Sequence, residues 1–119
     1  MRRVVVTGMG IVSSIGNNTQ EVLASLHEAK SGISRADKYA EMGFRSQVQG
    51  AATLNPADVI ERHAMRFLGQ GAAWNHIAME QAIQDSGLEP SDISNERTGI
   101  IMGSGGPSAR TIVDSADIT

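Results

Sequence analysis

The sequence contains no cysteine and very few aromatic residues. Its 119 residues include one tryptophan, one tyrosine and two phenylalanines. A chain without cysteine can form no disulfide, and it offers neither a thiol nucleophile nor a cysteine-ligated metal site. Burial of apolar surface contributes roughly 25 cal/mol per Å². Because the large apolar side chains are so few, we expect a free-standing domain of this composition to be only marginally stable.

Long apolar runs and an excess of basic residues are also missing. No apolar run approaches the roughly 20 residues that are needed to span a bilayer. The apolar start at Val4–Val6 is broken at once by Thr7 and Gly8, with no cleavage site after it, so we interpret it as a strand rather than a signal peptide. A net charge of −3 argues against a nucleic-acid-binding protein. We therefore expect a cytoplasmic protein that binds neither membrane nor nucleic acid.

What is present is an alternation of strand and helix patterns. A β-branched run at 3–7 and an apolar run at 97–104 both end at glycines and resemble strands that are buried on both faces. A helix is predicted over 19–29, with Asn18 as its cap and Glu21 completing a capping box. The order strand, helices, strand predicts a crossover α/β unit with parallel pairing. Because two strands do not make a stable sheet, the unit is expected to be part of a larger one.

The middle of the chain is predicted to be mainly helical. Residues 33–54 allow a short helix near 35–41 and an extended piece near 45–49. Asn55 and Pro56 begin a helical pattern that extends to Ser86, which Gly69 and Gly71 can divide into two helices. Gly87 is expected to end this pattern, Pro90 to prevent a helix from resuming, and the tail from Ala109 to begin another helix. The predicted apolar stripe consists of Met65, Leu68, Ala72, Met79, Ala82 and Ile83.

The glycine loop after the first strand invites a comparison with dinucleotide-binding loops. Such a loop needs a third glycine where this sequence has Ser13, and the short-chain dehydrogenase variant needs one where it has Val12. Asp37, the best candidate for a ribose contact, lies outside any predicted strand. A tight turn packed against a sheet is therefore favoured over a nucleotide site. The histidines at 27, 63 and 76 share no metal-ligand spacing, so no metal or cofactor is expected.

Two further motifs have both a structural and a functional interpretation. Arg62 and Arg66, at i and i+4 with His63 beside them, form either a solvated helix face or a docking site for an acidic partner. The loop Gly103–Gly106 is no Walker loop, because no Gly-Lys-Ser/Thr follows. It is either a mobile turn or a place where an acyl chain or a second subunit approaches the backbone closely.

Taken together, these segments resemble β-ketoacyl-[acyl-carrier-protein] synthases, and the similarity covers essentially the whole chain. The Ser-Ser-Ile-Gly-Asn-Asn stretch at 13–18 and the Gly-Ser-Gly-Gly loop at 103–106 are closer to bacterial synthase I than to synthase II. The collinear segments are 4–13, 14–18, 31–33, 62–67, 79–83, 85–88 and 103–106. Any one of them alone is a weak signal, and their shared order makes the resemblance specific.

The resemblance implies an α/β thiolase-like fold with five layers in the parent protein, which works as a homodimer. Residues 1–119 would cover the start of its N-terminal half and form an incomplete domain. The implied reaction is a decarboxylative Claisen condensation in fatty-acid elongation. An acyl group moves from acyl carrier protein to a cysteine, and malonyl-carrier protein then loses carbon dioxide and attacks the thioester. The family's cysteine and two histidines lie beyond the matched part, so this chain alone is expected to be inactive.

The residues that the resemblance does transfer are peripheral to the chemistry. Arg62 and Arg66 match basic positions that dock the acidic carrier protein. Gly105 and Gly106 match the loop that borders the acyl pocket near the dimer interface, where they would contact substrate. Pro107 departs from the family's glycine-richer loop and is expected to stiffen it. The alternative to a synthase is a non-catalytic binding or oligomerisation module derived from that family.

Overall fold

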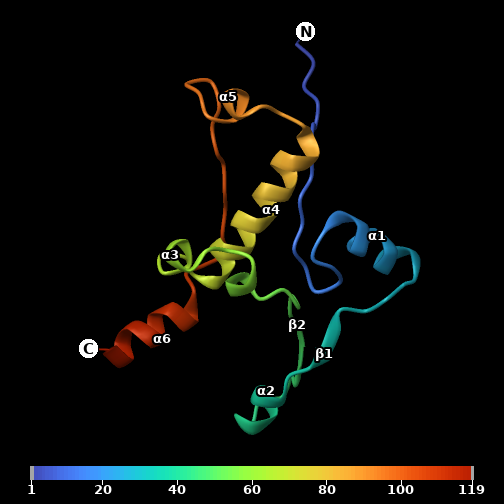
Figure 1. Cartoon of the computed structure of the whole chain (residues 1–119). Coiled ribbons are helices and arrows are strands. Elements are labelled where there is room, and N and C mark those ends of the chain that lie inside the picture. The colour runs from blue at the N-terminus through green and yellow to red at the C-terminus, as the bar shows by residue number, and fades with distance from the viewer. Residues whose placement is uncertain (1, 119) are drawn as a thin grey trace.

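The computed structural model describes residues 2–118 and shows short helices and strands arranged around one long helix (Figure 1). That helix is α4, Gln70–Ser86. The other elements in chain order are α1 (Thr19–His27), β1 (Ile33–Arg35), α2 (Asp37–Glu41), β2 (Val48–Gly50), η1 (Pro56–Asp58), α3 (Arg62–Met65), α5 (Pro90–Ile93) and α6 (Ala109–Ile118).

Both predicted long strands are extended but unpaired, so the expected parallel pairing was wrong for this chain. Within residues 2–118 the only sheet is the two-stranded antiparallel β1-β2, in which Ile33 lies opposite Gly50 and Arg35 opposite Val48. Segments 3–7 and 97–103 run in one direction on either side of α4, opposite to the helix (Figure 1). The side chains of Val4 and Ile101 are 94% and 99% exposed. A strand needs a hydrogen-bonded neighbour, and neither segment has one here.

The start of α1 confirms the predicted cap. The side-chain oxygen Oδ1 of Asn18 accepts from the amide of Glu21 at 2.9 Å, and Oε2 of Glu21 accepts from the amide of Asn17 at 2.8 Å. The glutamate thus reaches one residue further back than in a standard capping box. The helix ends at His27, two residues earlier than predicted.

The helical pattern from Asn55 is divided into η1, α3 and α4, and this division corrects the predicted stripe. The structure buries Ala73 and Ile77, whereas Ala72 and Met79 are exposed. Met65 does pack against the buried cluster as predicted. The stripe was drawn along one continuous helix, and the chain turns between α3 and α4, which changes the phase of every position after the turn.

The predicted C-terminal boundary of α4 is confirmed, but the expected effect of Pro90 was wrong. Gly87 adopts the left-handed conformation with φ of 64°, which favours glycine at this position. Pro90 does not prevent a helix. It is the first residue of the short helix α5, a position where the missing amide of proline costs nothing. The tail helix predicted from Ala109 is present as α6.

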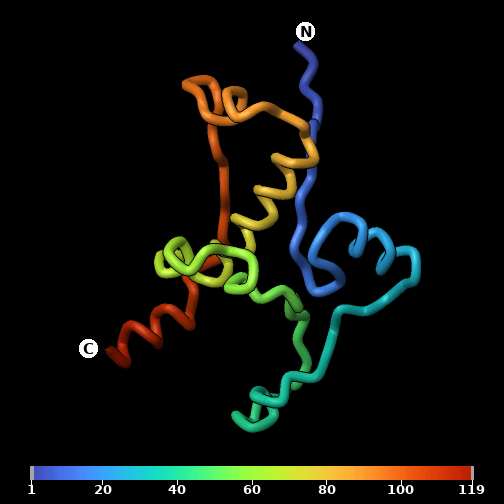
Figure 2. Tube along the Cα trace, viewed as in Figure 1, coloured from blue at the N-terminus to red at the C-terminus, as the bar shows by residue number. Residues whose placement is uncertain are grey.

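The buried core is small and the molecule is expanded. The main cluster consists of Ile60, Ala73 and Ile77. The radius of gyration is 17.5 Å, against about 13.5 Å for a compact domain of this length. The accessible surface is 10088 Å², against about 6200 Å² for a compact monomer of this mass. Figure 2 shows the same open path of the chain, with α2 and α6 projecting away from α4. The described elements therefore do not close into a globule.

Candidate functional site

The clearest concentration of uncompensated charge lies on the outer side of α3. Arg62, His63 and Arg66, here called the basic surface, are all exposed. Arg66 follows the last residue of α3 in helical conformation, with φ of −58° and ψ of −24°. The two arginines therefore lie one turn apart on the same side, as their spacing predicted.

The opposite side of α3 holds the basic surface in place. Met65 and Leu68 pack against the buried cluster, which includes Ile77 of α4. The preceding turn η1 is fixed by its own cap, because Oδ1 of Asn55 accepts from the amide of Ala57 at 3.4 Å. The alternation of inward apolar and outward basic residues orients the arginines toward solvent.

An indole contact ties the segment before η1 to α4. The indole nitrogen Nε1 of Trp74 donates to the carbonyl of Leu54 at 3.2 Å. Trp74 is the only tryptophan of the chain. The segment that leads into α3 is therefore fixed to α4 by a hydrogen bond as well as by packing.

Phe67 is the member of this surface that the sequence analysis missed. Its ring is 76% exposed. The imidazole of His63 lies edge-on to it at 6.0 Å between ring centroids, and the guanidinium carbon of Arg66 lies 5.9 Å from its centroid. A cation within about 6 Å of an aromatic ring is attracted to its face. The i, i+4 spacing of His63 and Phe67 was the available signal.

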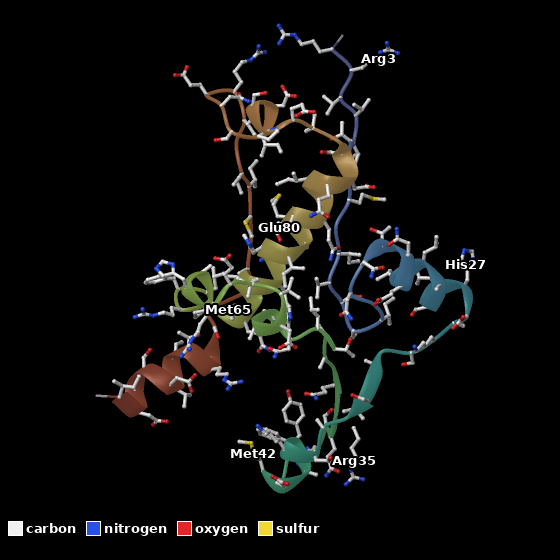
Figure 3. The ribbon with its side chains drawn as sticks, viewed as in Figure 1. Arg3, His27, Arg35, Met42, Met65 and Glu80 are labelled. Carbon is white, nitrogen blue, oxygen red and sulfur yellow. The ribbon has the colours of Figure 1, made fainter. Side chains whose placement is uncertain are left out.

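Among the described residues, no carboxylate forms an ion pair with the arginines of the basic surface. Within residues 2–118, ion pairs join Arg35 to Asp37 and Arg110 to Asp114, and both pairs lie elsewhere. Figure 3 places Arg35 near Met42, away from Met65 of α3. The two guanidinium groups are thus available for an external acidic group.

The loop that contains Gly105 and Gly106 is exposed, and only one of the two glycines borders a hollow. Gly106 lines a cavity of about 370 Å³ together with Gly69 and Ala72 from the start of α4 and Ile112 of α6. Gly105 is not among its lining residues. A Cβ added at either position would meet nothing within 4 Å. The described residues therefore leave the space beside both glycines open, and the approach of an acyl chain or a second subunit stays a prediction.

The glycine loop after segment 3–7 is packed against the helix α4 and not against a sheet as predicted. The turn lies further along the chain, where the amide of Ser13 donates to the carbonyl of Gly16 at 2.8 Å. A Cβ built on Gly10 would overlap the carbonyl oxygen of Ala78. The amide of Met9 donates to Oδ2 of Asp85 at 2.9 Å, and the amide of Ile11 donates to Oε1 of Gln81 at 3.1 Å. These two amides are already bonded, so they are not free to hold a phosphate group.

The three histidines lie on three different helices. His27 ends α1, His63 is on α3 and His76 is on α4. Figure 3 places His27 far from Met65 and the basic surface. Across residues 2–118, no group of three or more His, Asp or Glu side chains could hold a metal ion. In the same described part, no helix combines the length and apolar character that crossing a membrane requires.

Comparisons with known proteins identify what the chain is similar to. The family model described as "Beta-ketoacyl synthase, N-terminal domain" matches residues 1–117. The chain is 48% identical to 3-oxoacyl-[acyl-carrier-protein] synthase 1 of Haemophilus influenzae over 117 residues, and 48% identical to that of Escherichia coli K12 over 118 residues. Each alignment covers 98% of this chain and 29% of the relative. Synthase 2 of Coxiella burnetii is 31% identical over 105 residues, 87% of this chain and 25% of that relative.

Proposed function

This chain belongs to the β-ketoacyl synthase family, and we propose that it forms the start of a condensing enzyme of the synthase 1 type. The match to the family model over residues 1–117 carries this proposal. The higher identity to synthase 1 than to synthase 2 supports the predicted type. Since the chain spans less than a third of these relatives' length, the remaining chemistry is assigned to further residues of the same polypeptide.

The proposed reaction is the elongation of an acyl thioester by two carbons. A cysteine thiolate attacks the acyl thioester and releases the carrier thiol. Malonyl-carrier protein then loses carbon dioxide, and the resulting carbanion attacks the enzyme-bound acyl group, which breaks the enzyme thioester and regenerates the thiolate. Such a nucleophile requires a thiol activated by its surroundings. Because this chain has no cysteine, we infer that its 119 residues alone do not catalyse the reaction.

The proposed role of the basic surface is to dock the acyl carrier protein. The observation that supports it is that Arg62 and Arg66 are exposed, adjacent and free of any described carboxylate partner. Guanidinium groups bind carboxylates in a bidentate fashion, and complementary charge accelerates association as well as orienting it. We infer the identity of the partner from the names of the relatives, since each contains the words acyl-carrier-protein.

The proposed role of the loop at Gly105 and Gly106 is to border the acyl pocket. Gly106 already lines an apolar hollow beside α4 and α6, and the absence of side chains leaves room for an acyl chain or a second subunit. We further propose that the complete enzyme is a cytoplasmic homodimer with the five-layered thiolase-like fold of its family. Segments 3–7 and 97–103 would each gain neighbouring strands in that fold.

The alternative is a non-catalytic binding or oligomerisation module of the same family. Reading the coding sequence beyond Thr119 separates the two proposals. A cysteine and two histidines in the family's positions support the synthase, whereas a stop codon directly after Thr119 supports the module.

The docking role predicts a selective kinetic defect. In the complete synthase, the double substitution Arg62→Glu and Arg66→Glu reverses the charge of the basic surface, and we expect the KM for carrier-protein substrates to rise about tenfold at low salt with little change in kcat. The measurement is steady-state kinetics at two ionic strengths, because salt screens exposed charges.

A matched control is Lys38→Glu with Arg45→Glu, which makes the same change in net charge at exposed positions outside the basic surface. This control is expected to leave the KM nearly unchanged. Equal kinetics for the Arg62, Arg66 variant and the parent at low salt would remove the docking role.

A further inference from the structure

We propose that His63 makes docking at the basic surface sensitive to proton concentration, so that the acidic carrier protein binds more tightly below neutral pH. This inference rests on the docking role proposed above and adds a form of regulation to it. Imidazole is the side chain whose charge ordinarily changes between pH 5 and 8. At this surface its charge would add to two guanidinium groups that stay charged throughout that range.

The geometry places the imidazole within the docking surface instead of beside it. His63 is exposed and is adjacent to Arg62 in the same turn of α3. Its ring contacts the ring of Phe67 edge-on at 6.0 Å between centroids, and the guanidinium of Arg66 lies against the same ring. Phe67 therefore holds the imidazole and one guanidinium on one side of the helix, where a single partner can meet both.

The charged groups around His63 are of both signs. The arginines at 62 and 66 flank it along α3, and Glu61 is the residue before that helix. The turn η1, which packs against α3, contributes Asp58, whose Oδ1 accepts from the side-chain amide of Asn55 at 3.2 Å. Neither carboxylate is ion-paired to an arginine in the described structure. Carboxylates that an acidic partner brings to this surface would favour a charged imidazole at this position.

The sign of the effect follows from reciprocity between the two binding events. If a bound acidic partner favours the protonated imidazole, protonation must favour the bound partner by the same factor. The affinity therefore rises as pH falls through the range in which imidazole gains a proton. Carboxyl groups of the partner ordinarily stay ionised down to about pH 4, so their charge is constant across the range tested.

The test is the affinity of the complete synthase for unacylated acyl carrier protein, measured at pH 8.0 and pH 5.5 at one low ionic strength. For the parent we expect Kd to be roughly two- to fivefold lower at pH 5.5, the size of one exposed ion-pair interaction. His63→Gln is expected to lose this difference, and His63→Lys to bind about as tightly at both pH values as the parent does at pH 5.5. His27→Gln, on the distant helix α1, is the matched control and should keep the parent's pH dependence.

The outcomes distinguish this inference from the docking role itself. If Arg62→Ala and Arg66→Ala weaken binding but His63→Gln keeps the full pH dependence, the docking role stands and the role of His63 is wrong. If the two arginine variants bind as tightly as the parent, docking at this surface is wrong, and the inference about His63 is wrong with it.

Discussion

The long helix α4 and the extended segments beside it differ in hydrogen bonding and in burial. The backbone hydrogen bonds of a helix form almost entirely between its own residues, and α4 buries Ala73 and Ile77 in a cluster that Met65 of α3 packs against. Segments 3–7 and 97–103 have the more apolar sequences, yet Val4 and Ile101 are almost fully exposed. A helix carries its own hydrogen-bond partners, whereas a strand takes them from another segment. The difference shows which parts of this chain are self-sufficient and which require neighbours.

The largest expected effect comes from a charge placed in an extended segment. In the 119-residue chain, Ile101→Lys is expected to cost nothing and to reduce aggregation, because the side chain is exposed there. In the complete synthase, where we propose that segment 97–103 is a buried strand, the same change should destabilise by on the order of 4 kcal/mol or more. Thermal unfolding of the complete protein is the measurement, with Ile101→Val as control.

If Ile101→Lys is tolerated equally well in both contexts, segment 97–103 is not a buried strand and the comparison fails. Loss of stability with Ile101→Val as well would point to tight packing at this position and not to burial of charge.

A smaller effect is expected where the first extended segment meets α4. Gly10→Ala would place a methyl group on the backbone of α4 at Ala78, which cannot move without breaking the helix. We expect a loss of about 2 to 3 kcal/mol in the free energy of unfolding of the complete protein, as for overpacked positions. Gly71→Ala is the control, because Gly71 is exposed on α4 and a Cβ there meets nothing within 4 Å. Equal effects of the two variants would mean that the loop is not packed on α4 as described.

The smallest effect concerns one side chain that joins the loop to the helix. Gln81 accepts from the amide of Ile11 at 3.1 Å and donates through Nε2 to the carbonyl of Asn17 at 2.7 Å. Gln81→Ala removes both bonds, and we expect a loss of about 1 to 2 kcal/mol, because two partly buried backbone groups lose a partner. Chemical denaturation of the complete protein measures it, with the exposed neighbour Glu80→Ala as control. A larger loss for Glu80→Ala would contradict the anchoring role.

The features predicted correctly depend on residues close together in the sequence. Asn18 and Glu21 specify the start of α1, and Gly87 specifies the end of α4, because caps are interactions over a few residues. The i, i+4 spacing of Arg62 and Arg66 was likewise enough to place them on one side of α3. The close packing of the glycine loop was also expected, although its neighbour is Ala78 of a helix and not a sheet.

The features that could not be predicted depend on the phase or pairing of distant parts. The buried positions Ala73 and Ile77 were missed because the turn before α4 rotates the buried face of that helix relative to the preceding residues. The sequence does not specify the size of this rotation. The short strand β1 was missed because its only evidence is its register with β2. The contact of Phe67 with His63 and Arg66 depends on side-chain rotamers, which the spacing permits without specifying.

The order of these elements along the chain has a consequence for synthesis on the ribosome. The contacts of α4 with the N-terminal loop, η1 and α3 all lie within the first 87 residues, so they can form while translation continues. At roughly 5 to 20 residues per second, segment 3–7 precedes residue 119 by roughly 6 to 23 seconds. During that interval the nascent polypeptide contains the folded helix α4 and the apolar segment 3–7, which has no strand to pair with. In the proposed synthase, this first strand is therefore the segment that a molecular chaperone has most time to bind.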